Sequence, residues 1–281
     1  METICDRILV ETKYLGANVS CIQTQRGSVV VDSPFLPEDA REWKELIRMS
    51  TGTDAEFLIN TDHHFDHVLG NCFLTERIIC HSTAARGIKF LRDKNQLKQM
   101  IESTFADLLP GIEAEVDALA IPSPFITFDK SITIDMGDVT IGIEYVGGHS
   151  PGTVLTYVPE CKTVFTGDNV EGQFPYFGQS RFYEWKKVLQ RMMDLDIAVV
   201  VPGHGEVAGK EMVNRYLLFF EGLEKEVKGF DAAGMRMEQM AQESEVLHFF
   251  SSNVKMEDGF VPSWAETQYG LAAKQILSGQ D

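Results

Sequence analysis

The sequence contains 281 residues, of which 44% are hydrophobic and 24% are charged. This composition is typical of a globular protein with a sizeable core and not of a disordered or membrane-embedded chain. Lys and Arg total 25 against 42 Asp and Glu, which gives a formal net charge of -17. A chain of this charge repels phosphates at long range, so we expect no nucleic-acid partner.

The cysteines and the N-terminus together predict a cytoplasmic location. The five cysteines are odd in number, show no CxxC spacing and are expected to be reduced thiols: Cys5, Cys21, Cys72, Cys80 and Cys161. The N-terminus lacks the basic region and apolar run of a secretory signal. No apolar stretch reaches the length that spans a bilayer, so we expect no membrane partner.

The first third of the chain predicts strands and one helix. Residues 7–32 alternate β-branched runs with turns, which predicts a meander of short strands. Pro37 precedes acidic residues and then apolar residues at helical spacing, so a helix is expected to begin near Pro37. The run EFLIN at 56–60 predicts a buried strand that leads into a histidine-rich segment.

The remaining elements predict an insertion, a second block of strands and a helical end. A further strand is expected at 77–81, and the mostly helical stretch at about 82–120 is interpreted as an insertion. Short strands follow between about 126 and 168, and an apolar stripe at 180–196 predicts a helix before the strand IAVVV. We therefore expect a catalytic domain over 1–206 and a C-terminal helical extension over 207–281. This extension would pack on the core or on a partner subunit in a homodimer.

Candidate metal ligands are densest in residues 60–71, NTDHHFDHVLGN. Three histidines and two aspartates occur between Asp62 and His67. Alternate residues of an extended segment share a side, so Asp62 and His64 are expected on one face. A single aspartate or histidine is more often solvated or structural. The density of nitrogen and oxygen donors favours a metal site here.

Four more candidates follow apolar strands in turn-like settings: Asp32 in VVVDSP, His149 in GGHSPGT, Asp168 in FTGDN and His204 in VVPGHG. Loops at strand ends commonly carry the ligand-binding residues of α/β proteins, and flanking glycines allow close backbone approach. Together with the histidine-rich segment they supply donors suited to a pair of first-row metal ions.

These motifs, in this order between about Arg7 and Val207, resemble those of the metallo-β-lactamase superfamily. The resemblance implies an α/β fold, a four-layer αββα sandwich in which two sheets face each other with helices outside. Here the helical insertion and the C-terminal helices would be additions to that sandwich. The resemblance also implies a hydrolase with a dinuclear metal site along one sheet edge.

When the metal-binding positions of the family are transferred to this sequence residue by residue, the resemblance implies a ligand set from several loops. The set is Asp62, His64 and His149 for a first metal ion, Asp66, His67 and His204 for a second, and Asp168 as the bridge. Asp32 would support the site through hydrogen bonds without binding metal. His63 corresponds to a variable position and would point away.

One position departs from the family pattern. The usual box reads THxHxDH, whereas this chain reads TDHHFDH, so Asp62 replaces the first histidine. We expect two divalent ions, with zinc as the usual metal. The extra carboxylate favours harder ions such as iron or manganese, especially at the Asp62 site. Two alternatives stay open: His63 binds metal in place of Asp62, or only one metal is bound.

The expected reaction is hydrolysis by a water molecule activated between two metal ions. Asp66, which would orient this water, and the bridging Asp168 are the expected catalytic residues. No dense Lys/Arg cluster adjoins the motifs, so a small acyl substrate is favoured: a lactone, thioester, amide or β-lactam-like compound. The alternatives are a phosphodiester or sulfate ester hydrolase, an iron-dependent oxidoreductase on the same fold and a non-catalytic binding module.

Aromatic residues that follow Asp168 are candidate substrate contacts: Phe174, Tyr176, Phe177 and Tyr183. The alternative interpretation places them in the core or at the rim of the site. His248, in the apolar segment EVLHFFSSN, is interpreted as a structural residue.

Overall fold

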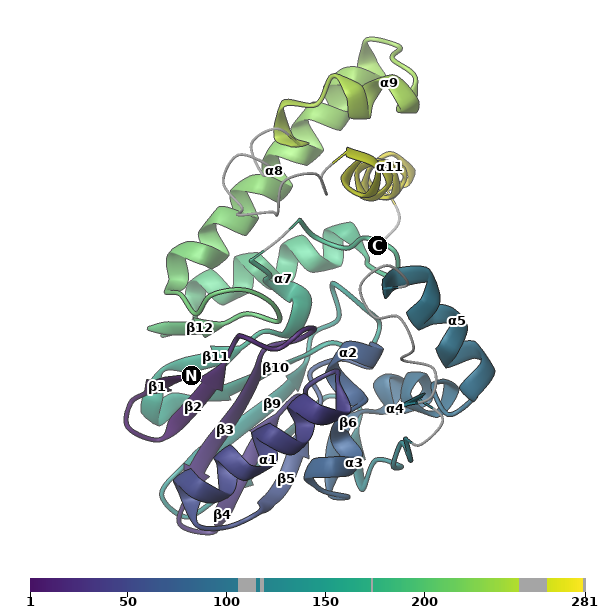
Figure 1. Ribbon diagram of the computed structural model, residues 1–281. Helices are drawn as coiled ribbons and strands as arrows, with labels where there is room; N and C mark the ends of the chain where they lie inside the picture. Colours follow the sequence, from purple (N-terminus) through teal and green to yellow (C-terminus); the bar gives the residue numbers. More distant parts are fainter. Residues whose placement is uncertain (106–114, 117–118, 173, 248–261, 280–281) are drawn as a thin grey trace. The chain divides into compact units, whose positions relative to one another are not determined.

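The computed structural model (Figure 1) describes residues 1–105, 115–116, 119–172, 174–247 and 262–279. The chain forms two compact units. Unit 1 comprises residues 1–145 and 156–161, and unit 2 comprises residues 146–155 and 162–281. The division predicted after residue 206 stays a prediction.

Unit 1 contains a mixed sheet of seven strands that follow one another in chain order. They are β1 (Glu2–Ile4), β2 (Ile8–Glu11), β3 (Val19–Thr24), β4 (Gly27–Val31), β5 (Ala55–Ile59), β6 (Ile78–His81) and β7 (Ile126–Phe128). Strands β1 to β4 pair antiparallel, as short turns allow, and β4 to β7 pair parallel through helical crossovers. The strands expected at 56–60 and 77–81 are β5 and β6.

Helix α1 (Pro37–Thr51) covers one face of this sheet (Figure 1). Its buried Trp43 and Ile47 share a core cluster with one residue from each of five strands: Leu9, Cys21, Val30, Leu58 and Ile78. These five residues pair in register across the sheet, so their side chains form a single row on one face. The helix begins at Pro37 as predicted, and Gly52 ends it in the left-handed conformation with φ of 75°.

The described part of the predicted insertion is helical. Helices α4 (Ser82–Phe90) and α5 (Lys94–Phe105) follow β6, while residues 106–114 and 117–118 lie outside the described residues. Ile88 and Leu97 from these helices pack with Val68 and Leu69 in one core cluster. Val68 ends the short helix α2 (Phe65–Val68), which is followed by α3 (Asn71–Leu74). The insertion therefore packs against the segment that carries the histidines.

A second sheet has five strands in the order β12-β11-β10-β9-β8. Its strands are β8 (Ser131–Asp135), β9 (Thr140–Tyr145), β10 (Val154–Val158), β11 (Thr163–Phe165) and β12 (Val199–Val201). Strands β8 and β9 form an antiparallel pair in unit 1, and β11 and β12 form a parallel pair in unit 2. The two blocks of strands expected from the sequence thus belong to two sheets.

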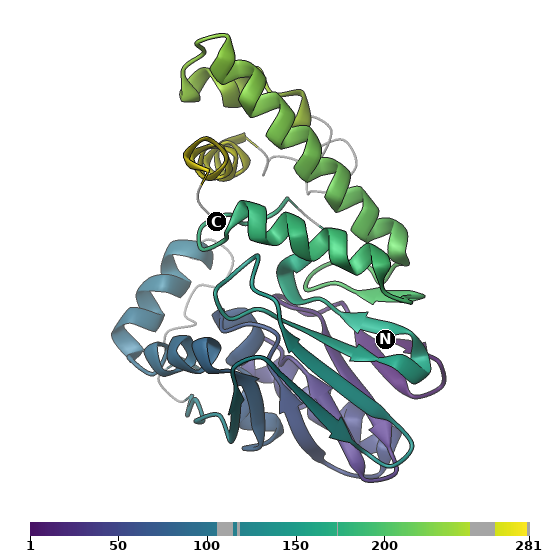
Figure 2. The same ribbon diagram turned by 180° about the vertical axis from the view of Figure 1, so that it is seen from behind.

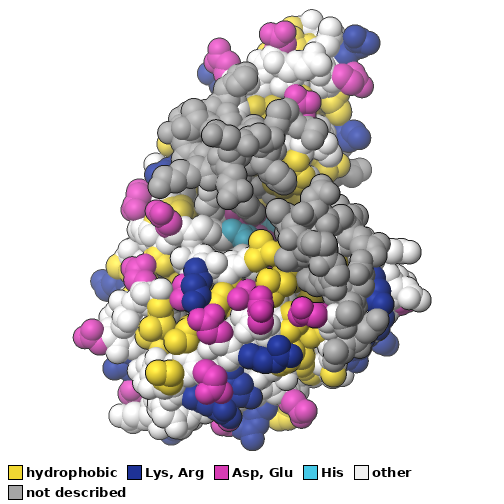
Figure 3. All heavy atoms as spheres, in the orientation of Figure 1, with side chains coloured by type: hydrophobic (Ala, Val, Ile, Leu, Met, Phe, Trp, Pro, Cys, Tyr) yellow, Lys and Arg dark blue, Asp and Glu magenta, His cyan; other side chains and the backbone are white. Residues whose placement is uncertain are grey.

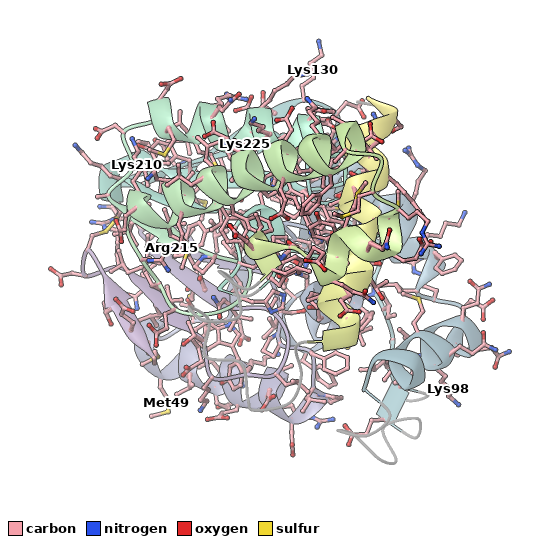
Figure 4. The ribbon with its side chains drawn as sticks, turned by 90° about the horizontal axis from the view of Figure 1, so that it is seen from above. Met49, Lys98, Lys130, Lys210, Arg215 and Lys225 are labelled. Carbon is pink, nitrogen blue, oxygen red and sulfur yellow. A yellow bond between two sulfur atoms is a disulfide. The ribbon has the colours of Figure 1, made fainter. Side chains whose placement is uncertain are left out.

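Unit 2 also contains the C-terminal helices: α7 (Phe182–Asp194), α8 (Lys210–Ala232), α9 (Met237–Gln242) and α11 (Pro262–Ser278). Helices α7 and α8 lie side by side (Figures 1 and 2). Buried aromatic rings fill the space around them, with Phe177, Phe182 and Trp185 each within 5.7 Å of the Phe220 ring. Lys210, Arg215 and Lys225, labelled in Figure 4, extend from α8. His248 lies outside the described residues.

The cysteines differ from the prediction. Cys5 and Cys161 form a disulfide with their Cα atoms 5.8 Å apart, whereas Cys21, Cys72 and Cys80 are free. Sequence spacing could not show this pair, because its partners are 156 residues apart. One of the reasons for expecting a cytoplasmic location is therefore lost. Within the described residues, we find no helix with both the length and the apolar character needed to cross a bilayer.

Candidate metal centre

In unit 1 the candidate ligands lie at the carboxyl ends of two neighbouring parallel strands, β4 and β5. Asp32 directly follows β4, and the segment Asn60–His67 directly follows β5. The backbone N–H of Asp32 donates to the carbonyl of Ile59 over 2.9 Å, which joins the two strand ends. Parallel pairing thus explains why segments about 30 residues apart meet at one edge of the sheet.

Asp32 is a buried hydrogen-bond acceptor that orients His67. Its carboxylate accepts the backbone N–H and the hydroxyl of Thr61 over 2.8 and 2.5 Å, and its Oδ2 lies 3.0 Å from Nδ1 of His67. A partner on Nδ1 leaves Nε2 of the imidazole as the metal-binding atom. Asp32 adopts a φ of 56°, a left-handed conformation that aspartate tolerates better than most residues.

The backbone of His67 is also held firmly. Its carbonyl accepts hydrogen bonds from the backbone N–H and the hydroxyl of Ser33, each over 3.1 Å, and from Nδ2 of Asn60 over 2.9 Å. Asn60 and Asn71 in turn hydrogen-bond each other through both side-chain amides. The sequence analysis did not identify these residues. Their only signal was that they are polar residues adjacent to apolar strands.

Asp62, which replaces the usual histidine, is completely buried. Its Oδ1 accepts the backbone N–H groups of His63 and His64, over 2.5 and 3.2 Å, so one carboxylate oxygen shapes the turn. The His63 ring lies against α4, where a Cβ added at Gly87 would be 2.1 Å from its Cδ2. Asp66 lies in the first turn of α2 and is half-buried.

In unit 2 the same strand-end arrangement recurs. Strands β11 and β12 are parallel neighbours, with Phe165 paired to Val201. Asp168, in the 3₁₀ turn η2 (Gly167–Asn169), follows β11, and His204 follows β12. The carboxyl ends of parallel neighbours lie at the same sheet edge, so these two residues are brought together.

Asp168 lies between two histidines. Its Oδ2 is 3.5 Å from Nε2 of His149, and its Oδ1 is 3.4 Å from Nε2 of His204. A Cβ added at Gly203 would be 1.9 Å from Asp168 Oδ1, so the carboxylate occupies space that only glycine leaves open there. The spacing lets each carboxylate oxygen share a metal ion with a different imidazole.

The loop that carries His149 depends on glycine and on Asn169. Gly148 has a φ of 92°, and a Cβ there would be 2.4 Å from Oδ1 of Asn169. That oxygen accepts the backbone N–H of His149 over 3.0 Å, while the Asn169 amide donates to the carbonyl of Gly147. The indole of Trp185 contacts the imidazole edge-on, with ring centroids 5.4 Å apart.

Glu171 is a buried carboxylate that the sequence analysis missed. It is 2% exposed, and its Oε1 lies 3.8 Å from Nδ1 of His149. His149, Asp168 and Glu171 each offer a ligand atom within 4.8 Å of the others. The pKa of the buried Tyr216 lies well above its ordinary value, first because of burial and then because of the Glu171 charge. In the sequence, the one indication of its role was that Glu171 is an acidic residue three positions after Asp168.

The four aromatic candidates lie in different environments. Phe174 and Phe177 are buried, the former against Phe219 and the latter against Trp185. The hydroxyl of Tyr183 donates to a backbone carbonyl of α11. The Tyr176 ring lies 5.9 Å from the His149 ring, and burial raises the pKa of its hydroxyl. Tyr176 therefore lies beside a candidate ligand.

The donors in each unit fit divalent metal ions. Unit 1 offers Asp62, His64, Asp66 and His67, and unit 2 offers His149, Asp168 and His204. Mixed imidazole and carboxylate sets suit zinc, iron and manganese. Most of these side chains are buried, and buried carboxylates call for a compensating positive charge such as a metal ion.

Comparison with known proteins identifies the family. Residues 13–204 match the sequence model of the metallo-beta-lactamase superfamily. The chain belongs to this superfamily. Its members are mostly hydrolases and typically bind divalent metal ions. The fold expected from the motifs, two sheets with helices and additional C-terminal helices, is thereby confirmed.

Individual relatives are distant. Beta-lactamase-like protein 2 homolog of Caenorhabditis elegans is 24% identical over 209 residues, which cover 72% of this chain and 61% of that protein. Human acyl-coenzyme A thioesterase MBLAC2 is 23% identical, with 71% of this chain and 76% of that protein covered. A metallo-beta-lactamase family protein from Thermus thermophilus has the same fold, with a TM-score of 0.68, 18% identity and coverage of 97% and 93%. The chain thus spans less than two thirds of the C. elegans relative.

Proposed function

We propose that the protein is a dinuclear metal-dependent hydrolase that acts on a small acyl substrate, with a thioester as the first class to test. The candidate ligands are those that the resemblance implies: Asp62, His64 and His149 for a first ion, Asp66, His67 and His204 for a second, and Asp168 as the bridge. Zinc, iron or manganese would fit these donors.

The position of Asp168 carries this proposal. Its two carboxylate oxygens face the Nε2 atoms of two different histidines over 3.5 and 3.4 Å. A carboxylate that only made hydrogen bonds or ion pairs would not need two imidazoles of this kind around it. The orientation of His67 by Asp32 supports the same conclusion, because it too leaves an Nε2 atom available.

The residues of the chain would position and activate the reactants. Bound divalent ions would supply Lewis acidity and lower the pKa of water. Asp66 would accept a hydrogen bond from the attacking water and orient it toward the acyl carbon. Asp32 and Asp168 would keep the imidazoles in place, so little reorganisation would be needed during the reaction. Tyr176 would contact the acyl group or donate a hydrogen bond to its oxygen.

Two observations favour a thioester over a phosphate or sulfate ester. A relative that covers 71% of this chain is an acyl-coenzyme A thioesterase. The ring beside His149 belongs to Tyr176, which offers an apolar face and one hydroxyl and carries no positive charge. On the face shown in Figure 3, basic and acidic side chains are interspersed among apolar ones. At the bond that is cleaved, a phosphate or sulfate ester carries negative charge and would be better served by arginines, whereas the carbonyl group of a thioester is neutral.

The test combines metal analysis with a substrate screen. Purified protein should contain up to two metal ions per chain and should release thiol from short-chain acyl thioesters. Asp168→Asn should lower kcat/KM by at least about 100-fold, because one donor and the bridge are lost together. Asp196→Asn, at an exposed aspartate paired with Lys162, is the matched control and should keep wild-type activity. Thioester hydrolysis that survives both chelation and Asp168→Asn would refute the proposal.

A further inference from the structure

Glu171 is the buried carboxylate of unit 2 that the proposed ligand set does not use. It lies three residues beyond Asp168, at the end of the segment that begins with η2, and 2% of its surface is exposed. Removing a carboxylate from water is costly unless a positive charge or strong hydrogen-bond donors compensate. The groups that surround the Glu171 carboxylate therefore indicate its role.

His149 is enclosed by two carboxylates on opposite ring nitrogens. Asp168 Oδ2 lies 3.5 Å from its Nε2, and Glu171 Oε1 lies 3.8 Å from its Nδ1. The two acidic side chains leave one turn of backbone three residues apart, so a single local conformation places both beside the imidazole. The distance to Nδ1 is longer than a hydrogen bond of about 3 Å, so the structure shows a carboxylate oxygen facing a ring nitrogen, and the hydrogen bond between them is part of the inference.

Neighbouring residues hold the backbone and ring of His149 and the backbone beside Glu171. Asn169 holds the His149 backbone, and Trp185 contacts the imidazole edge-on. The residue after Glu171 is also anchored, because the backbone N–H of Gly172 donates to the carbonyl of His204 over 2.7 Å. The imidazole of His149 and the backbone beside Glu171 are therefore both held in place.

We propose that Glu171 is a positioning residue for His149: its carboxylate accepts a hydrogen bond from Nδ1–H and so keeps Nε2, on the Asp168 side, unprotonated and able to bind metal. This inference rests on the proposed function, because it assumes that His149 is a metal ligand. Asp32 holds Nδ1 of His67 in the same way at 3.0 Å. One histidine ligand in each unit is thus oriented by a buried carboxylate.

The first measurement is made on metal-free protein by ¹⁵N NMR of the histidine side chains, with the His149 signals assigned from a His149→Gln variant. In the wild type, His149 should carry its proton on Nδ1. In Glu171→Leu, which has no acceptor, the signals should shift toward the Nε2-protonated tautomer. A wild-type tautomer in Glu171→Leu would overturn the inference.

The second measurement is zinc affinity, by competition with a chromophoric chelator. Glu171→Leu should weaken binding about 10- to 100-fold, while Glu171→Gln should weaken it less, because its amide oxygen still accepts a hydrogen bond. Glu206→Gln removes the same charge at an exposed position two residues after His204 and controls for long-range electrostatics. If Glu171→Leu does not fold, the Gln variant must still bind zinc more weakly than Glu206→Gln.

Three results would separate the inference from the function on which it rests. If the wild type binds zinc and both Glu171 variants bind it equally well, only the positioning role fails. If both variants lose one zinc ion per chain to the same extent, Glu171 is a direct ligand and the positioning role is also wrong. If the wild type binds no metal at all, the proposed function fails, whatever the tautomer of His149.

Discussion

At the scale of single residues, glycine determines how closely the backbone can approach the candidate ligands. Gly203 precedes His204, and a Cβ at this position would be 1.9 Å from Asp168 Oδ1 and 2.8 Å from the carbonyl carbon of Gly167. The latter atom belongs to the backbone and cannot rotate away. A side chain at Gly203 must therefore displace either the Asp168 carboxylate or the chain beneath it.

Gly203→Ala should lower the free energy of unfolding by about 1–3 kcal/mol and should also weaken metal binding. Gly229→Ala, on α8, is the matched control, because a Cβ there meets nothing within 4 Å. The control should stabilise the protein by about 0.5–1 kcal/mol through helix propensity. Urea denaturation of both variants tests the comparison. Equal stability of the two would show that the backbone at Gly203 adjusts freely.

At the scale of elements, a charged cluster joins two helices of unit 2. Glu224 on α8 lies 2.7 Å from Nζ of Lys186 on α7 and 2.5 Å from Nζ of Lys228 one turn along α8. Burial raises the pKa of Glu224, but the hydrogen bonds from the two lysines outweigh it and leave the pKa below its ordinary value of 4.5. The carboxylate is thus favoured in the folded state.

The consequence is a pH-dependent contribution to stability. A pKa lowered by folding stabilises the protein above pH 4.5, and this contribution is lost as the pH falls through the folded-state value. Glu224→Gln should cost about 1 kcal/mol at pH 7, because the pair is partly exposed, and less below about pH 4. Glu221→Gln, an exposed change on the same helix, is the control. A Glu224→Gln cost that stays constant from neutral pH down to about pH 3 would contradict this assignment.

The C-terminal helix α11 also fixes the segment that carries the aromatic candidates. The side-chain oxygen of Gln268 accepts the backbone N–H of Phe177, and Gln275 binds backbone groups of Phe177 and Phe182. Helix α11 therefore takes part in shaping the loop beside His149. Dimerisation through the C-terminal helices stays a prediction, to be tested by light scattering of the purified protein.

At the scale of the whole molecule, one covalent link joins distant parts of the sequence. The Cys5–Cys161 disulfide closes a loop across 156 residues within unit 1. A cross-link of this length restricts the unfolded chain and typically adds about 2–4 kcal/mol to stability. Such links persist mainly in oxidising compartments. The redox state of these two cysteines in the cell therefore depends on where the protein is located.

Reduction should lower the melting temperature of the wild type, and Cys5→Ser should reproduce the lower value. Reductant should then have no further effect on Cys5→Ser, because Cys161 has lost its partner and the other three cysteines are free thiols. Peptide mapping without reductant should recover the linked Cys5 and Cys161 fragments. An identical melting temperature of the wild type with and without reductant would show that the link is absent or makes no contribution.

The sequence by itself determined the secondary structure near the candidate ligands, and the resemblance to the superfamily supplied the candidates. Helix α1 begins at Pro37, strand β5 leads into Asn60–His67, and strands β11 and β12 precede Asp168 and His204. Local patterns sufficed for these features, because hydrophobic periodicity and turn residues act over a few neighbouring positions. The superfamily was indicated separately, by the resemblance of these motifs and of their order to those of a known family, and the match over residues 13–204 confirms it.

The resemblance implied a supporting role for Asp32, but only the tertiary structure decided which candidate ligand it contacts and showed that Glu171 lies near another. Asp32 contacts His67 because β4 and β5 are parallel neighbours, and Glu171 approaches His149 because the turn after β11 lies beside the loop after β9. The disulfide between Cys5 and Cys161 likewise joins residues with no local relation. Such contacts depend on strand pairing and packing between distant segments, and no short stretch of sequence contains that information.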